Sequence, residues 1–267
     1  MVATGLGTVS CPPECLVDMS LSVIVITKNE EQRLARCLES VAFADEIVVL
    51  DGGSTDRTAE IGQAKGARVE ISTTWNGFGT QKNRVLALAT GDWVLSLDAD
   101  EEVTPELAAE IRKTLQNPAV DCYEIPRLSE FCGRFLRHSG WYPDYVARLF
   151  KRGTAKFSDD LVHERLIPTG GVGRLKHPLI HRGYGGPADT LRKIDAYSTA
   201  WAEQAVAAGR RAGFAAAPLH GLAAFVKTYI LRRGFLDGAA GLAVAISSAE
   251  VAYYKYFKLW SLRYTGT

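Results

Sequence analysis

The sequence predicts an α/β protein with a mostly parallel sheet, helices on both faces, a small antiparallel addition and a helical C-terminal segment. Segments typical of strands and of helices alternate four times within about 100 residues. Alternation of this kind gives parallel strands joined by right-handed crossovers. Acidic clusters directly follow two of these strands, at the sheet edge where open parallel sheets bind their ligands.

The four expected strands are short and apolar, a composition typical of strands that are covered on both faces. They are Leu21–Ile26, Glu46–Leu50, Ala67–Ile71 and Trp93–Leu97. The first expected helix carries Leu34, Leu38 and Val41 at helical spacing. The second ends at Gly66, and the third runs from a Thr80 cap to Ala89. A fourth helix is expected to begin at Thr104-Pro105, an N-cap followed by a proline at the first helical position.

The pattern changes after about residue 120, where short strands broken by glycine and proline predict the antiparallel addition. From Ala188 onward the chain is helical, alanine-rich and basic. We therefore expect a disordered extension over residues 1–18, an α/β domain over 19–186 and a helical segment over 187–267. Met19 directly precedes the first strand, and we hypothesise that it is the true start.

The near balance of 31 Lys+Arg and 30 Asp+Glu conceals two halves of opposite charge. Residues 1–126 carry 10 basic and 20 acidic side chains, whereas residues 127–267 carry 21 basic and 10 acidic ones. Such asymmetry indicates partners of opposite sign. The five cysteines lack zinc-finger spacing, and the N-terminus lacks the pattern of a secretory signal. No uncharged apolar run reaches the length that a bilayer requires, so we expect no membrane crossing.

Two acidic clusters stand at the ends of expected strands. Asp98 and Asp100 follow Trp93–Leu97, where two carboxylates can hold a divalent cation together with phosphate oxygens. The alternative is an acidic helix start. Asp51 follows Glu46–Leu50 and can accept hydrogen bonds from a ribose or a base, unless it only shapes an ordinary β-to-α turn.

Two further polar clusters lie along the same edge. Thr27-Lys28-Asn29-Glu30 ends the first strand, and Gln81-Lys82-Asn83-Arg84 begins a helix. Cationic side chains and free N–H groups at a helix start suit a diphosphate. The alternative for each cluster is a solvated helix start.

The order of TKNE, DGGSTD, QKN and DADEE resembles the N-terminal domain of glycosyltransferase family 2, the inverting class with the Rossmann-like GT-A fold, over roughly Leu21–Ile180. The resemblance implies a UDP-sugar donor and a Mg²⁺ or Mn²⁺ cofactor. It further implies that the nucleoside is held by Thr27, Asn29, Glu30 and Asp51. Lys82 would bind the donor, Asp98 would contact the ribose or the metal, and Asp100 would coordinate the metal on the diphosphate.

Three C-terminal stretches carry a more detailed resemblance within the family. Residues 144–152, 157–166 and 229–242 look like the lipopolysaccharide-core β-1,4-glucosyltransferase branch of WaaE/LgtF type. That branch implies transfer of glucose to a lipid A–core glycolipid. The alternatives are a polyprenyl-phosphate glycosyltransferase or a non-catalytic nucleotide-binding membrane adaptor.

An inverting transfer needs a base for the acceptor hydroxyl, and an acidic cluster offers candidates. Family 2 enzymes place an acidic pair where Val162-His163-Glu164 stands, so the resemblance implies that Glu164 is the base, with Asp160 in reserve. His163 would touch the diphosphate, orient Glu164 or serve only the structure. Arg148 and Trp141-Tyr142 are candidates for acceptor docking, with core packing as the alternative for Trp141 and Tyr142.

The C-terminal stretch Ala252–Tyr264 interleaves aromatic residues with Lys255, Lys258 and Arg263. A basic aromatic helix suits an anionic membrane surface, and the alternative is a helix packed on the catalytic domain. We expect a cytoplasmic protein, peripheral on the inner face of the cytoplasmic membrane. Nucleic-acid binding is disfavoured because the basic half has no recognition motif, and a dehydrogenase because no G-x-G-x-x-G follows the first strand.

Overall fold

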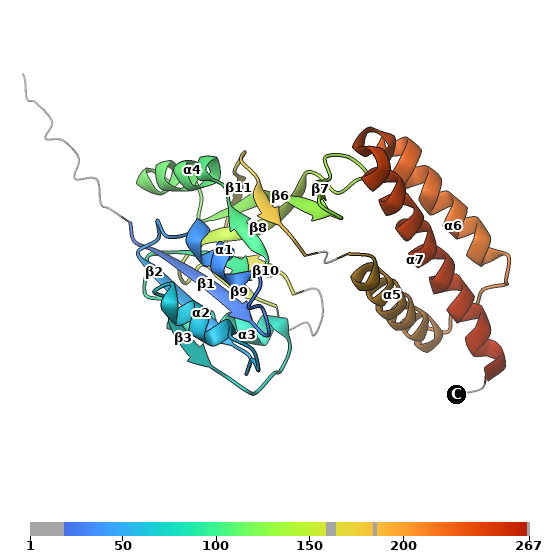
Figure 1. Cartoon of the computed structure of the whole chain (residues 1–267), viewed down its shortest axis with the longest axis horizontal. Helices are drawn as coiled ribbons and strands as arrows, with labels where there is room; N and C mark the ends of the chain where they lie inside the picture. Colours follow the sequence, from blue (N-terminus) through green and yellow to red (C-terminus); the bar gives the residue numbers. More distant parts are fainter. Residues whose placement is uncertain (1–18, 159–163, 184–185, 266–267) are drawn as a thin grey trace, which may run out of the picture.

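The computed structural model describes residues 19–158, 164–183 and 186–265. An α/β part and a helical part lie beside each other, joined at the start of the first long C-terminal helix (Figure 1). The expected disorder of residues 1–18, and with it the hypothesis about Met19 as the start, concerns a segment outside the described residues.

Four parallel strands form the N-terminal half of the sheet, in the order β3-β2-β1-β4. Their bounds are Leu21–Thr27 for β1, Glu46–Asp51 for β2, Arg68–Ile71 for β3 and Trp93–Asp98 for β4. Successive β1 side chains enter different cores, Val23 and Val25 on one face and Ile24 and Ile26 on the other. This confirms the predicted parallel sheet covered on both faces.

Helices cover the two faces unequally. On one face lie α1 (Leu34–Ser40), α2 (Thr58–Ala64) and α4 (Pro105–Gln116), and on the other lies α3 (Phe78–Leu88). The predicted Thr104 cap is confirmed, because its Oγ1 accepts a hydrogen bond from Leu107 N at 3.1 Å. The predicted Thr80 cap is wrong: α3 already begins at Phe78, preceded by Gly77 with φ 98°, a left-handed conformation that favours glycine.

Most of the later strands extend this sheet, whereas β9 and β10 pair with each other in a separate two-stranded sheet. β8 (Asp144–Lys151) pairs antiparallel with β4, and β6 (Cys122–Phe131) pairs antiparallel with β8. β12 (Leu179–His181) then lies parallel to β6 and antiparallel to β5 (Glu101–Val103). The shorter strands are β7 (Arg134–Phe135), β9 (Ala155–Phe157), β10 (Leu166–Pro168) and β11 (Val172–Arg174). The antiparallel addition is thus present, and it is mixed.

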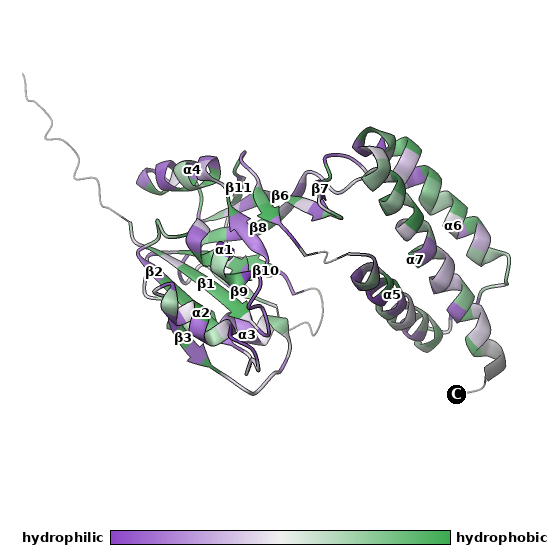
Figure 2. Ribbon diagram, viewed as in Figure 1, coloured by the Kyte–Doolittle hydropathy of each residue, from purple (hydrophilic) through white to green (hydrophobic). Residues whose placement is uncertain are grey.

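The helical part comprises α5 (Pro187–Ala207), α6 (Ala216–Val226) and α7 (Gly238–Thr265), with a π-helical turn over Lys227–Leu231 and a 3₁₀ turn over Gly234–Asp237. Both α5 and α6 pack against α7. Figure 2 shows α6 as mostly hydrophobic, in contrast to the mixed surface of α5.

One helical stretch within the described part of the chain, Gly234–Leu262, is long and apolar enough to cross a membrane by length and composition, with a mean hydropathy of 1.4. The stretch is not an uncharged run, because it contains Asp237, Glu250, Lys255 and Lys258, so the expectation of no membrane crossing stays a prediction. The greater part of the stretch is α7, which continues through Glu250 without a break. Length and composition alone are weak evidence for a membrane span, since core helices of soluble proteins also meet them.

Candidate functional site

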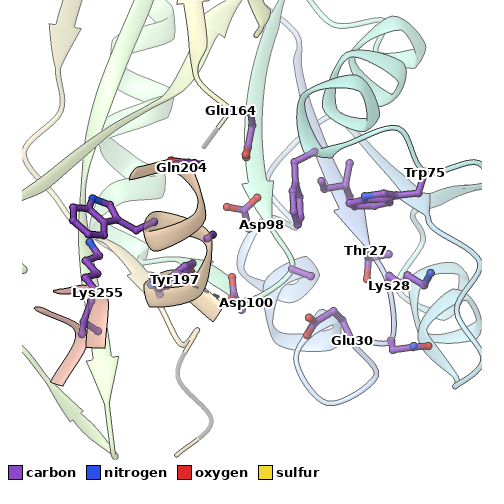
Figure 3. Close-up of a pocket in the computed structure, with 18 residues that line it drawn as sticks. Thr27, Lys28, Glu30, Trp75, Asp98, Asp100, Glu164, Tyr197, Gln204 and Lys255 are labelled. Carbon is purple, nitrogen blue, oxygen red and sulfur yellow. Dashed lines mark ion pairs between the residues drawn. The ribbon is translucent and has the colours of Figure 1, made fainter. Parts of the chain in front are cut away.

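A cavity of about 1090 Å³ opens at the carboxyl edge of the parallel strands, between the sheet and the helices α5 and α7. Figure 3 shows acidic side chains from the sheet on one side of it and α5 and α7 on the other. The polar and aromatic residues that line it are Thr27, Lys28, Asn29, Glu30, Trp75, Phe78, Asp98, Asp100, Glu164, His181, Tyr197, Trp201, Gln204 and Lys255.

Strand register brings the predicted residues to this edge. Thr27 at the end of β1 pairs with Asp51 of β2, and Ile26 pairs with Asp98 of β4. The chain turns directly after Asp98, so Asp100 lies beside it before β5 begins. Ligands of open parallel sheets bind where the connections diverge, and β1 is such a point because its neighbours are β2 and β4.

Asp51 and Asn29 hold two loops of this edge together. The buried Asp51 carboxylate accepts hydrogen bonds from the amides of Gly53 at 3.1 Å and Ser54 at 2.8 Å. Asn29 Oδ1 accepts one from the Thr55 amide at 2.9 Å, so the β1 loop is tied to the β2 loop. Asn29 also lines the cavity, but Asp51 does not.

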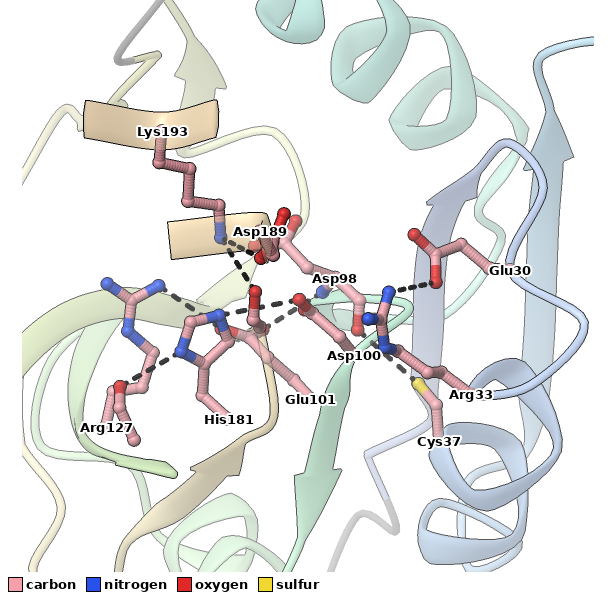
Figure 4. Close-up of polar contacts among 12 residues, drawn as sticks. Glu30, Arg33, Cys37, Asp98, Asp100, Glu101, Arg127, His181, Asp189 and Lys193 are labelled. Carbon is pink, nitrogen blue, oxygen red and sulfur yellow. Dashed lines mark hydrogen bonds and ion pairs between the residues drawn. The ribbon is translucent and has the colours of Figure 1, made fainter. Parts of the chain in front are cut away.

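Thr27 presents a buried hydroxyl to the cavity, and Glu30 presents a carboxyl group. Thr27 is 4% exposed, and its buried Oγ1 has no hydrogen-bond partner among the described residues. A buried hydroxyl without a partner is costly, which points to a ligand. Burial raises the pKa of the Glu30 carboxyl, although the Arg33 guanidinium at 3.0 Å acts in the opposite direction (Figure 4).

Lys82 connects two of the predicted acids. Its Nζ lies 2.8 Å from Asp98 Oδ1 and 2.8 Å from Glu164 Oε1, and its side chain is 4% exposed. Lys82 lies on α3, which can approach the Glu164 segment closely because residue 79 is glycine. A Cβ at Gly79 would stand 1.8 Å from the Ser158 carbonyl oxygen.

The second oxygen of Asp98 is bound by Arg148, whose guanidinium also donates to Glu101 Oε1 at 2.7 Å. Burial alone would raise the pKa of Asp98, but Arg148 and Lys82 outweigh it and hold that pKa well below its usual value. Burial raises the pKa of Glu101, an effect that Arg148 only partly offsets. Arg148 is 6% exposed, so its predicted role in acceptor docking is wrong: it belongs to the support of Asp98.

Asp100 faces the imidazole of His181, with 3.5 Å between Oδ2 and Nε2 (Figure 4). His181 lies on β12, opposite Glu101 of β5, and its Nδ1 is 3.0 Å from Ser129 Oγ. Burial would raise the pKa of Asp100, but the hydrogen bond and charge of His181 outweigh it and lower that pKa. A carboxylate and an imidazole are both ligands of Mn²⁺-like cations, and each lines the cavity.

Metal-ligating side chains are sparse at this site. Among the described residues no group of three His, Cys, Asp or Glu side chains is arranged to hold a metal ion. Both oxygens of Asp98 already contact cationic groups. Asp100 with His181 is therefore the better placed pair, and oxygens of a bound diphosphate would have to complete the coordination.

The far wall of the cavity comes from the helical part. Tyr197, Trp201 and Gln204 extend from α5, and Lys255 extends from α7. Lys255 Nζ lies over the Trp201 ring at 5.7 Å from its centroid. One turn later on α7, Lys258 instead binds Asp195 Oδ1 at 2.7 Å and thereby ties α7 to α5.

The structure thus brings together the cavity residues Thr27, Asn29, Glu30, Asp98, Asp100 and Glu164, with Lys82 directly behind Asp98. Asp160 and His163 lie outside the described residues. Trp141 packs edge to face against Phe131 in a core cluster, as the packing alternative predicted.

Sequence reasoning missed His181 and the α5 wall. His181 reaches the site only through the pairing of β12 with β5, a contact between strands far apart in the chain. The sequence showed only a histidine in an apolar strand, and histidines in such strands often have a purely structural role. Tyr197, Trp201 and Gln204 carried a better signal, because their spacing places them on one helix face.

The chain matches a known family. The model of "Glycosyl transferase family 2" matches residues 22–170, more than half of the chain. An uncharacterised glycosyltransferase of Rickettsia prowazekii is 28% identical over 256 residues, covering 91% of this chain and 86% of the relative. The lipopolysaccharide core biosynthesis glycosyltransferase LpsC of Rhizobium meliloti is 28% identical over 256 residues, covering 89% and 93%.

Solved structures of glycosyltransferases also resemble the chain. The TarS 1–349 structure of S. aureus matches with a TM-score of 0.48 at 16% identity, covering 93% of this chain and 92% of that one. Glucosyl-3-phosphoglycerate synthase of Mycobacterium tuberculosis, with Mn²⁺ and UDP, matches with a TM-score of 0.36 at 27% identity, covering 43% and 45%. Both TM-scores lie below 0.5, so the family assignment rests on the sequence match.

Proposed function

The chain belongs to glycosyltransferase family 2, and we propose that it transfers glucose from a UDP-sugar, with inversion, to a hydroxyl of a lipopolysaccharide-core or other lipid-linked saccharide. One observation carries the proposal: a carboxylate, Glu164, and the acids Asp98 and Asp100 face the same cavity. Lys82 bridges Glu164 and Asp98 at 2.8 Å on each side. The proposed base would thus lie beside the acids that face the leaving diphosphate.

The nucleoside would bind over the β1 end. Thr27 Oγ1 is a buried group that needs a partner, and Glu30 offers a carboxylate to ribose hydroxyls. Trp75 and Phe78, which meet edge to face at 5.0 Å, provide aromatic surface for the base. Asp51 would act indirectly, by shaping the loop that Asn29 supports.

Mg²⁺ or Mn²⁺ would be held by Asp100, with His181 as its neighbour in the cavity. Their fit rests on the ionised Asp100 carboxylate and on the imidazole 3.5 Å away. When bound, such an ion neutralises the charge that develops on a leaving diphosphate. Asp98, already paired with Lys82 and Arg148, would contact the ribose.

Glu164 would take the proton of the acceptor hydroxyl as that oxygen attacks the sugar C1, while the C1–O bond to the diphosphate breaks. Lys82 would hold the Glu164 carboxylate in position for this step, because its own buried ammonium is fixed by Asp98. General bases typically contribute about 10²–10⁴-fold. Asp160 remains the reserve candidate.

The acceptor would enter from the helical side. Trp201 and Tyr197 offer aromatic faces to a sugar ring, and Lys255 offers a cation to a phosphate or carboxylate on it. We therefore treat residues 19–186 as the donor domain and 187–267 as the acceptor- and membrane-associated segment. LpsC, whose name assigns it to lipopolysaccharide core biosynthesis, aligns across this segment as well.

A panel of UDP-sugars tests the proposal, each assayed with Mn²⁺, Mg²⁺ or EDTA. The acceptor is core glycolipid extracted from cells that lack the enzyme. We expect metal-dependent transfer from UDP-glucose to that glycolipid. Transfer that persists in EDTA would contradict the metal assignment, and no transfer from any UDP-sugar would contradict the proposed function.

A further inference from the structure

Residues 204–236 have a one-sided charge pattern. They contain no Asp or Glu and five basic residues, Arg210, Arg211, Lys227, Arg232 and Arg233. All five are exposed, and none of them takes part in an ion pair with another described residue. They stand in two groups, one before α6 and one after it.

Between these two cationic groups, α6 carries no charged residue. Only Ala217 and Gly221 are buried, where α6 meets α7. The large side chains Leu219 and Leu222 are 66% and 63% exposed. The apolar surface continues on both sides of these leucines, and its further exposed members are Phe214, Val226, Ile230, Leu231, Phe235 and Leu236. A helix that is apolar all round needs a covering partner.

Several described side chains of the basic aromatic stretch on α7, residues 252–262, are engaged in packing within the helical part. Tyr253 stacks on Phe257, Tyr256 stacks on His220, and Trp260 packs against Phe214. Lys258 is bound by Asp195. These side chains pack α7 against α5 and α6, whereas Tyr254 is 41% exposed. Membrane contact through this stretch stays a prediction.

We propose that residues 204–236 dock on an anionic lipid bilayer, with α6 lying in the plane of the interface. Leu219, Leu222 and the apolar side chains after them enter the acyl boundary, while the five cations contact the head groups. Amphipathic segments with flanking Lys and Arg bind in this way. The docking deepens the membrane association in the proposed function by naming the surface and the lipid charge.

Charge favours a bilayer over a second copy of the chain. A two-fold dimer through α6 would place the same patch on both subunits, so cationic groups flanking each helix would face one another. Anionic lipids instead complement both groups at once. Each Lys or Arg near such a surface contributes about fivefold in affinity.

Flotation of the full-length protein with vesicles tests the docking without donor or acceptor. One vesicle preparation is phosphatidylcholine alone, and the other contains phosphatidylglycerol as well. The variants are Leu219→Ser/Leu222→Ser and Arg211→Gln/Lys227→Gln. Ile71→Ser is the matched control, because Ile71 is 64% exposed on the α/β part. UDP binding and the thermal midpoint verify that each variant is folded.

We expect the wild type and Ile71→Ser to bind the anionic vesicles alike. The double serine variant should bind at least tenfold more weakly, and the double glutamine variant about 25-fold more weakly at low salt. Equal binding by all variants would overturn the proposal. So would a wild-type dimer that the serine variant dissociates while vesicles stay unbound. Neither result depends on turnover, so the proposed function is tested separately.

Discussion

The two parts of the molecule use cations in opposite ways. In the α/β part, Lys82 and Arg148 are buried, and each bridges two carboxylates. In the helical part, the five basic residues of 204–236 are exposed and lack ion-pair partners among the described residues. Buried pairs fix geometry, whereas solvated charges are available to a partner. The nearly neutral total of the chain therefore conceals buried ion pairs in one part and an exposed cationic surface in the other.

The largest expected effect concerns the buried ion pairs of the α/β part. Arg148→Met leaves Asp98 and Glu101 without their shared guanidinium, and removal of one partner from a buried ion pair costs about 3–5 kcal/mol. The control is Arg174→Met, because Arg174 pairs with Glu124 at the surface and is 63% exposed. That substitution should cost about 0–1 kcal/mol. Urea unfolding measures both, and equal losses would show that burial does not distinguish the pairs.

The second prediction concerns the Asp100–His181 pair, which we propose holds the metal. His181→Ala should raise the Mn²⁺ concentration for half-maximal activity about 10–100-fold, because the metal loses a ligand or the group that orients Asp100. His177→Ala is the control, since His177 pairs with Glu110 on the surface away from the cavity. A His181→Ala enzyme with the wild-type metal dependence would remove His181 from the site.

Lys255 is a cation of the helical part, but it lines the cavity at the end of the sheet. Lys255→Ala should raise the KM for a phosphorylated core glycolipid about tenfold and leave the KM for UDP-glucose unchanged, because one charge-assisted contact is lost. Lys113→Ala, an exposed lysine on α4, controls for net charge. An increase confined to the donor KM would instead place Lys255 at the nucleotide.

A smaller effect concerns pH. The pKa of Asp100 is lowered in the folded protein, so its ionised form favours folding above the unfolded pKa of about 3.9. That stabilisation disappears as the pH falls through the folded pKa. The stability difference between wild type and Asp100→Asn, measured by urea unfolding without metal, should therefore be larger at pH 7 than at pH 3. A difference that grows toward acid would contradict the direction of the shift.

The parallel half of the fold could be predicted from the sequence, because its strands are marked by local patterns of apolar residues. Continuous apolar runs marked β1, β2 and β4 to within one residue at each end. The polar residues after these runs then had to share one sheet edge. Lys82 was also accessible to sequence reasoning, as part of the helix start that follows β3.

The remaining site residues depend on contacts that no local pattern encodes. Arg148 was a candidate for acceptor docking, but the pairing of β8 with β4 places it beside Asp98. For the aromatics of α7 the sequence left membrane contact and packing open, and only the tertiary structure places Tyr256 against Trp201 and Phe257 against Phe214. The exposure of the apolar residues on α6 likewise depends on tertiary packing, which their composition does not encode.

The central claim is that Glu164, held by the Lys82–Asp98 pair, is the base of the transfer. Turnover of Glu164→Gln with UDP-glucose and core glycolipid, measured alongside UDP binding, tests it most directly. We expect UDP to bind as in the wild type while kcat falls about 10²–10⁴-fold. A kcat near that of the wild type with UDP binding intact would contradict the assignment.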